Sequence, residues 1–168
     1  MKIINSDKKK QISLCDYKTE HYAALEAFFL PEEQKQYTAM PAAALEKCLT
    51  DPDRHPIVIL AGEIPVGFFV LHSGEAIKSF SDNPKAILIR ALSIDISNQG
   101  KGYGKLAMMM APEFVSRNFN GIDEIVLAVN KRNIAAKKLY EKAGFQFEGT
   151  MREGRIGPQY ILHYRLNT

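Results

Sequence analysis

The segment AILIRALSIDISNQGKGYGKLAMMM, residues 86–110, joins two different sequence patterns through a loop rich in glycine and lysine. Its first part, residues 86–95, is an apolar run with one arginine in its middle, which is typical of a strand buried on both faces. Three glycines and two lysines follow within residues 98–106, and an apolar helical pattern comes next. A helix N-terminus offers unpaired N–H groups and the positive end of its dipole, and glycine keeps side chains out of the way. The segment therefore predicts a strand, an anion cradle and a helix, in that order.

Two common phosphate-binding motifs do not match this loop. A Walker loop needs GxxxxGK[ST], but Gln99 stands where its first glycine should be, and Leu106 follows the Gly104-Lys105 pair. A dinucleotide fingerprint GxGxxG also fails, because Lys105 or Ala107 occupies the position of the third glycine. The spacing thus favours an anion site of another kind.

The rest of the chain mixes strand and helix patterns without a repeat or a linker, so we expect one domain over residues 1–168. A short turn, GEIP, separates two apolar runs as in a hairpin, and Pro112 should kink or interrupt the helix that follows the glycines. Thr19 is suited to cap a helix, and Gly144 is suited to end one. Strands are expected at residues 12–17, 56–61, 66–72, 86–95, 124–130, 145–151 and 159–166, helices at 19–29, from 41 to 49, after 104 and at 133–143, and a loop at 73–85. This order predicts an α/β (α+β) sandwich around a mostly antiparallel sheet.

Composition excludes several classes of function. Lys and Arg together number 22 against 19 for Asp and Glu, an excess too small for the basic face of a nucleic-acid-binding domain. Cys15 and Cys48 have no Cys or His partner at zinc-ligand spacing, so we expect neither a disulfide nor a metal site. No stretch approaches roughly 18 uninterrupted apolar residues, and the N-terminus has no apolar signal-peptide core. We expect a cytoplasmic protein without a membrane or nucleic-acid partner, and we leave a homodimer open.

Two motifs in the second half point to one family. The first is Q/R-x-x-G-x-G/A, matched by Gln99, Gly102 and Gly104. The second is N-x-x-A-x-x-L-Y-E-K-x-G-F, matched by Asn133, Ala136, Leu139, Tyr140, Glu141, Lys142, Gly144 and Phe145. Over residues 87–147 the chain resembles the GCN5-related N-acetyltransferase (GNAT) superfamily, and the N-terminal half matches only in the order of its elements. The resemblance implies a GNAT-like, mixed and strongly twisted sheet of six or seven strands, flanked by helices and splayed centrally to admit acetyl-coenzyme A.

The same resemblance implies a site for acetyl-coenzyme A as cosubstrate, with no metal. The pyrophosphate would lie on the N–H groups of the glycine loop, the N–H of Leu92 would face the acetyl oxygen, and Ile94 would bind the pantetheine arm. Tyr140 would be the general acid, since a phenol is close in pKa to a departing thiol. The cofactor-binding residues expected in this way are Leu92, Ile94, Gln99, Gly100, Lys101, Gly102, Tyr103, Gly104, Lys105, Asn130, Asn133 and Tyr140.

Each of these residues also has a structural interpretation. Leu92 and Ile94 suit core packing, and Tyr140 suits the apolar face of a helix. Asn133 suits a helix cap, and the lysines of the loop suit ordinary surface positions. No general base is identified, because Glu26, Glu32, Glu33, Glu75 and His72 are all weak candidates.

The function implied is direct transfer of an acetyl group from acetyl-coenzyme A to a primary amine of a small molecule or peptide. The alternatives are a coenzyme A sensor and a non-catalytic, acetyltransferase-like interaction subunit. Arg90 is the one residue that indicates an acceptor, because an arginine within an apolar strand needs an anion, a cavity or solvent. It suits a carboxylate beside the reacting amine and disfavours polyamines and aminoglycosides. The alternative for Arg90 is an internal ion pair with one of the protein's own carboxylates.

Overall fold

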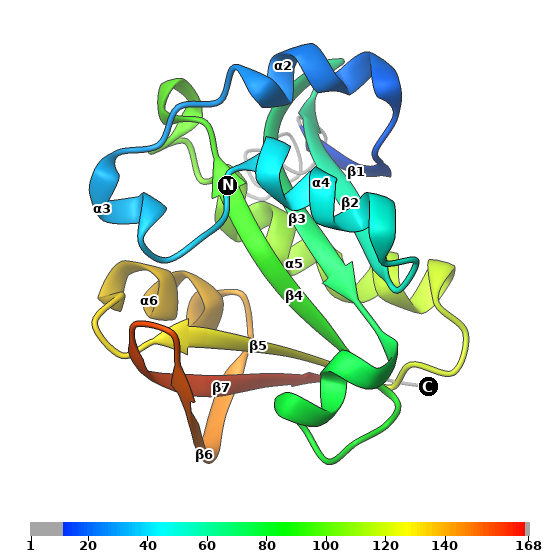
Figure 1. Ribbon diagram of the computed structural model, residues 1–168, viewed down its shortest axis with the longest axis vertical. Coiled ribbons are helices and arrows are strands. Elements are labelled where there is room, and N and C mark those ends of the chain that lie inside the picture. Colours follow the sequence, from blue (N-terminus) through cyan, green and yellow to red (C-terminus); the bar gives the residue numbers. More distant parts are fainter. Residues whose placement is uncertain (1–11, 167–168) are drawn as a thin grey trace, which may run out of the picture.

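A computed structural model describes residues 12–166, which form one seven-stranded mixed sheet with the order β1-β2-β3-β4-β5-β7-β6 (Figure 1). Neighbouring strands are antiparallel, except that β4 and β5 are parallel. The strands are β1 Ile12–Asp16, β2 Arg54–Ala61, β3 Ile64–His72, β4 Ala86–Ile94, β5 Glu124–Asn130, β6 Gln146–Gly154 and β7 Gly157–Arg165. The sheet has the number of strands and the mostly antiparallel pairing that the sequence predicted.

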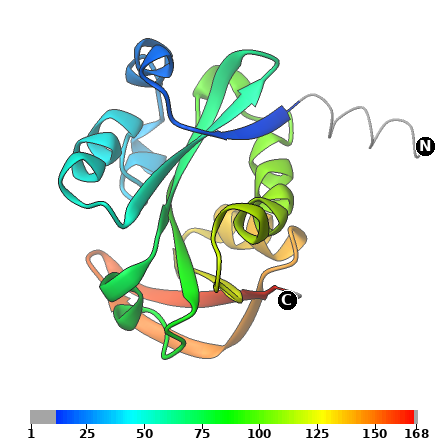
Figure 2. The same ribbon diagram turned by 90° about the vertical axis from the view of Figure 1, so that its right-hand side faces the viewer.

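Helices cover both faces of the sheet, with α5 and α6 on one side and α2 and α4 on the other (Figure 2). The α-helices are α2 Tyr22–Glu26, α3 Glu32–Lys35, α4 Pro41–Thr50, α5 Tyr103–Asn118 and α6 Ile134–Lys142, and the 3₁₀ turns are η1 Thr19–His21, η2 Gly74–Ser79 and η3 Ile96–Asn98. The main core lies under α5 and includes Phe69, Ile87 and Met108. A second core lies under α2 and α4, and a smaller third core lies beside η2.

The sheet opens between β4 and β5. These strands pair only from Ala86 to Leu88, opposite Glu124 to Val126, whereas β5 pairs with β7 along its whole length. Beyond Leu88, β4 runs away from β5 and crosses the molecule diagonally (Figure 1). The ends of two central strands are therefore left without a neighbouring strand on one side, which is the central splay expected from the family resemblance.

A bulge in β4 lies beside this opening. Val70 pairs with Arg90 and Phe68 pairs with Ser93, so Ala91 and Leu92 together stand opposite one residue of β3. Ala91 has φ 58°, which is left-handed backbone in a residue other than glycine. Such a conformation costs roughly 1–2 kcal/mol, and bulges of this kind re-aim backbone groups, often beside functional sites.

Several expected elements differ from the structure. The helix expected at 19–29 is a 3₁₀ turn followed by the short α2, and its N-cap is Lys18 rather than Thr19. The loop expected at 73–85 contains η2, and the hairpin turn is shorter than GEIP, because β3 already starts at Ile64. The short helix α3 was not expected.

The expected interruption at Pro112 was wrong. Helix α5 runs through this position, although proline cannot donate the backbone hydrogen bond there. Pro112 is buried, and the side chains of Ala111 and Val115 near it on the helix belong to the main core. The burial of apolar side chains around the proline offsets the loss of one backbone hydrogen bond. The expected helix from Pro41 and the expected helix end at Gly144, where φ is 105°, are confirmed.

Candidate functional site

The glycine loop ends at the N-terminus of the longest helix, α5. Gly102 is its N-cap with φ 81°, and Gly100 has φ 80°, so both occupy left-handed backbone that other residues rarely adopt. A Cβ atom added to either glycine would meet no protein atom within 4 Å, which leaves open space in front of the loop. A Cβ on Gly104 would lie 3.1 Å from Leu139 Cδ1, so this glycine lets α5 approach α6 closely. We call residues 99–105 the cradle.

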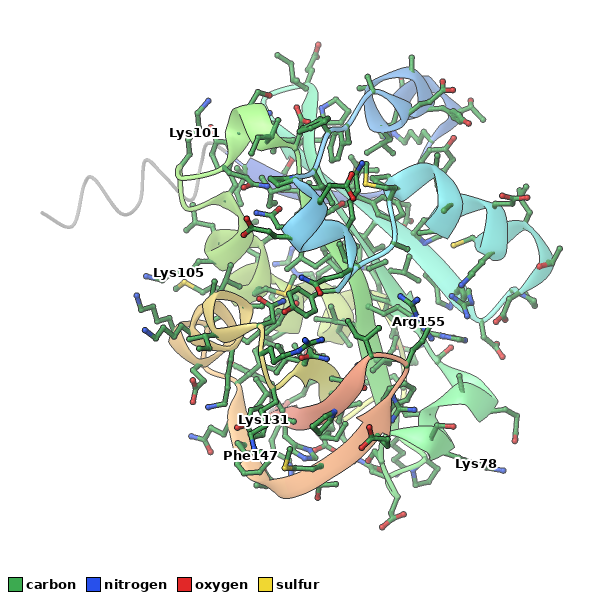
Figure 3. The ribbon with its side chains drawn as sticks, turned by 60° about the vertical axis from the view of Figure 1, so that its left-hand side comes forward. Lys78, Lys101, Lys105, Lys131, Phe147 and Arg155 are labelled. Atoms are coloured by element: carbon green, nitrogen blue, oxygen red, sulfur yellow. The ribbon has the colours of Figure 1, made fainter. Side chains whose placement is uncertain are left out.

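The lysines of the cradle project away from the fold (Figure 3). Lys101 Nζ lies 3.5 Å from Asn98 Oδ1 and 6.0 Å from the centre of the Tyr103 ring. Both lysines are exposed, and the first-turn backbone N–H groups of α5 point out of the helix end beside them. Backbone groups and a flexible positive rim thus meet at the same place.

A cavity of about 680 Å³ runs from the cradle through the splay between β4 and β5. Its lining comes from β4, from the end of β5 and the start of α6, from the segment between α3 and α4, and from the β6–β7 turn. Every site residue predicted from the sequence lines this cavity, except Lys101. Residues from Arg90 to Tyr140, far apart in the chain, are thus collected around one space: Arg90, Leu92, Ile94, Gln99, Gly100, Gly102, Tyr103, Gly104, Lys105, Asn130, Asn133 and Tyr140.

Leu92 lies in the bulge, where the described strands offer it no paired residue on β3 or β5. Its carbonyl accepts a hydrogen bond of 3.1 Å from the hydroxyl of Thr38, in the segment before α4. This contact holds that segment against β4 and closes one wall of the cavity.

Tyr140 lies on α6, half-buried, with its ring edge against Phe145 at 6.2 Å between ring centres. Burial raises the pKa of the Tyr140 phenol to about 12. The hydroxyl is therefore protonated at neutral pH, which is the state in which it can donate a proton or a hydrogen bond.

Three predicted polar residues already have partners within the protein. Gln99 donates from Nε2 to the carbonyl of Ile94 at 2.8 Å and exchanges amide hydrogen bonds with Gln34 of α3. Asn130 donates to the carbonyl of Ile156 at 3.3 Å and so holds the β6–β7 turn. Asn133 caps α6 by accepting from the N–H of Ala136. Each has a structural role, and its contact with a cofactor stays a prediction.

Arg90 makes a hydrogen bond to a histidine rather than an ion pair. Its Nη1 donates to Nδ1 of the buried His72 at 3.1 Å, and Nε2 of His72 lies 3.2 Å from Asp51 Oδ2. Because arginine can only donate, Nδ1 must accept and Nε2 must carry the proton. Burial, and then the charges of Arg54 and Arg90, lowers the pKa of His72, which favours the neutral ring.

Sequence reasoning missed the other basic residues at this end of the cavity. Lys47 of α4, Arg54 of β2, Arg152 of β6 and Arg155 of the β6–β7 turn all line it. Arg155 lies toward the middle of the view in Figure 3, near the tip of the β6–β7 hairpin and well apart from the cradle lysines. They belong to three separate segments, because Arg152 and Arg155 share the β6–β7 hairpin, and no local spacing links the three segments to one another or to Arg90.

Metal-ligand side chains do not gather in the described part of the chain, where no group of three or more His, Cys, Asp or Glu residues could hold an ion. Among residues 12–166, no helix is both long and apolar enough to cross a membrane.

Comparison with known proteins identifies the family. Residues 19–145 match the model of the Acetyltransferase (GNAT) family. The chain is 48% identical over 158 residues to the uncharacterized N-acetyltransferase YbbJ of Bacillus subtilis, which covers 94% of this chain and 99% of that protein. Among solved structures, the aminoglycoside acetyltransferase AAC(6')-Ib with ribostamycin and coenzyme A is similar, with a TM-score of 0.74 and 20% identity over 92% of this chain and 93% of that one. A chimeric spermidine N-acetyltransferase from Vibrio cholerae and hSSAT has a TM-score of 0.67 and 20% identity over 92% and 95%. The chain belongs to the GNAT family of acetyltransferases.

Proposed function

We propose that this protein transfers an acetyl group from acetyl-coenzyme A directly to a primary amine of a small molecule or peptide. The observation that carries the proposal is the single cavity that joins the cradle to Arg90 through the splay, with Leu92 and Tyr140 between them. A cofactor and an acceptor that entered from opposite faces of the sheet would meet at these two residues.

The cradle fits the pyrophosphate of coenzyme A. Left-handed glycines leave open space in front of the N-terminus of α5, where N–H groups and the helix dipole favour an anion. Gly100, Gly102 and Gly104 would hold the pyrophosphate through the backbone, and Lys101 and Lys105 would add charge at the rim. Beyond the cradle, the edge of β4 at Leu92 and Ile94, which does not pair with β5, would offer backbone N–H groups to the pantetheine arm, with Tyr103, Asn130 and Asn133 beside it.

Acetyl-coenzyme A supplies the acetyl thioester. In the proposed reaction the amine nitrogen forms a bond to the acetyl carbon and the carbon–sulfur bond breaks. The N–H of Leu92 donates to the acetyl oxygen as negative charge develops there, which is how a backbone donor lowers such a barrier. Tyr140 gives its proton to the departing sulfur. The amine nitrogen releases its proton to water, and water returns a proton to Tyr140, because no aspartate, glutamate or histidine of the described residues lines the cavity.

Arg90 would bind a carboxylate of the acceptor near the amine. Its guanidinium is in a fixed orientation through His72 and forms no ion pair with a carboxylate of residues 12–166. The internal ion pair considered as the alternative is thus not formed there.

Thiol release from acetyl-coenzyme A in the presence of a panel of amines tests the proposal. Tyr140→Phe should keep coenzyme A affinity and lose turnover by about 10²- to 10⁴-fold, the usual contribution of general acid–base catalysis. Tyr164→Phe is the matched control, because the Tyr164 ring also packs on Phe145 but does not line the cavity. Unchanged turnover in Tyr140→Phe would remove the acid role. Coenzyme A binding without thiol release for any amine would indicate a sensor or an interaction subunit instead.

A further inference from the structure

The end of the cavity away from the cradle has an unusual charge. Five basic side chains line it, and no aspartate or glutamate of the described chain does: Lys47, Arg54, Arg90, Arg152 and Arg155. Asp51 does not line the cavity but pairs with Arg54 at 3.2 Å. The four remaining positive charges exceed the net charge of the whole chain, which is +3. This end of the cavity is therefore positively charged.

The guanidinium groups are oriented by neutral partners, which leave their charge uncompensated. Arg90 bonds to the neutral ring of His72, and Arg152 donates to Oε1 of Gln159 at 2.7 Å. The guanidinium of Arg152 also lies 4.3 Å from the centre of the Phe80 ring. Hydrogen bonds and ring contacts therefore fix the two half-buried arginines in place. Their positive charges repel each other, and no carboxylate of the described residues bonds to either guanidinium to relieve this repulsion.

The position of this charge separates it from the cradle. Ile87 and Ile89 of β4 belong to the core beside α5, whereas Leu88 belongs to the core beside η2. Arg90 alternates with Ile89 and so lies on the face opposite α5, where it meets His72 of β3. The cofactor's pyrophosphate would lie at the other face, at the start of α5. The basic end is thus available to the second substrate.

We infer that the acceptor is a small amine that carries at least two anionic groups, one bound at Arg90 and the other at Arg152 and Arg155. This rests on the proposed function, and it adds a second anionic group to the single carboxylate expected from Arg90. The second group is a carboxylate or a phosphate, since an arginine fork binds both in the same way. Polycationic acceptors such as spermidine and ribostamycin, which relatives of this fold bind or acetylate according to their names, would meet repulsion here.

The first experiment measures kcat/KM by thiol release for five acceptor types. L-Glutamate and O-phospho-L-serine are the dianionic amines, L-alanine has one carboxylate, L-alaninamide has none, and spermidine is the polycation. The wild type should prefer one of the two dianionic amines, and comparison between them identifies the second group. A preference for spermidine, L-alaninamide or L-alanine would overturn the inference.

Variants assign the preference to named residues. Arg90→Met and Arg152→Met should each lower the ratio of kcat/KM on the dianionic amine to that on L-alaninamide by about 10- to 100-fold, the usual effect of losing a charged hydrogen-bond partner. Arg117→Met is the matched control, because Arg117 lies on α5, pairs with Glu113 and does not line the cavity. Equal ratios in all three variants would overturn the assignment.

A second experiment does not depend on catalysis. Calorimetry with glutarate, a dianion without an amine, should show binding to the wild type and to Arg117→Met, and much weaker binding to Arg90→Met and Arg152→Met. If no amine releases thiol but glutarate binds in this pattern, the proposed function fails and the anion site stands. If thiol release occurs but glutarate does not bind to the wild type, the anion site fails and the proposed function stands.

Discussion

The substitution Gly102→Ala tests the cradle and separates its effect on the stability of the fold from its effect on coenzyme A binding. Alanine at φ 81° costs roughly 1–2 kcal/mol of backbone strain, offset in part by the lower entropy of the unfolded chain. For a domain of this size we expect Tm to fall by about 2–8 °C. Gly121, in the turn after α5, has the same φ of 81° and the same open space around its Cβ. The 16-residue helix α5, about 24 Å long, separates it from Gly102. Gly121→Ala should therefore lose the same stability.

Only Gly102→Ala should lose coenzyme A affinity, because its new methyl group would occupy the open space in front of the N-terminus of α5. Loss of one hydrogen bond to a phosphate costs about 1.5–3 kcal/mol, or about 10- to 150-fold in affinity. Coenzyme A at about 100 times its wild-type Kd adds about 2.7 kcal/mol of stability, which raises Tm by about 5–11 °C. After a hundred-fold loss of affinity the same concentration adds only about 0.4 kcal/mol, or about 1 °C.

The assay is thermal unfolding of the wild type, Gly102→Ala and Gly121→Ala with and without coenzyme A. Wild type and Gly121→Ala should show the full ligand shift, and Gly102→Ala should show almost none. A full shift in Gly102→Ala, with the same loss of stability as in Gly121→Ala, would refute the cradle. Equal loss of the shift in both glycine variants would show instead that the effect comes from general destabilisation.

Three further predictions concern the site and its supports. Burial raises the pKa of Tyr140 to about 12, so kcat/KM should rise with pH as the amine loses its proton and should show no decline at any pH up to about 10. A decline near pH 8 that disappears in Tyr140→Phe would contradict the acid role of Tyr140. Ala91→Gly should raise the free energy of unfolding by up to about 1 kcal/mol in urea, since glycine relieves the strain at φ 58°, whereas Ala91→Val should lower it. The folded-state pKa of His72 is lowered from 6.5, so stability should fall as pH falls below 6.5, and His72→Gln should reduce that acid-side loss in thermal unfolding at pH 5 and pH 7.

Local sequence was enough to predict the strand, the glycine loop and the helix at which we propose that the cofactor binds. The glycine loop, the strand before it and the helix after it are neighbours in the chain, so their chemistry and geometry follow from residues 86–110 together. The α6 motif is local in the same way, which is why the cap at Asn133 and the end at Gly144 were predicted at the observed residues. Short helices were less predictable, because η1, α2 and α3 have three to five residues each and are too short to show a helical period in the sequence.

The sequence by itself determined that residues 86–106 form a strand, a left-handed glycine turn and a helix start, because glycine alone combines positive φ with open space at Gly100 and Gly102. It also determined the family, through motifs in which every residue is a near neighbour of the next. Only the tertiary structure decided where β4 leaves β5, how Ala91 bends β4 and which charges line the cavity. Lys47 of α4, Arg54 of β2 and the pair Arg152 and Arg155 of the β6–β7 hairpin come from three segments that meet only after the sheet has formed. Their combined charge depends on distances in space, and no spacing along the chain encodes those distances.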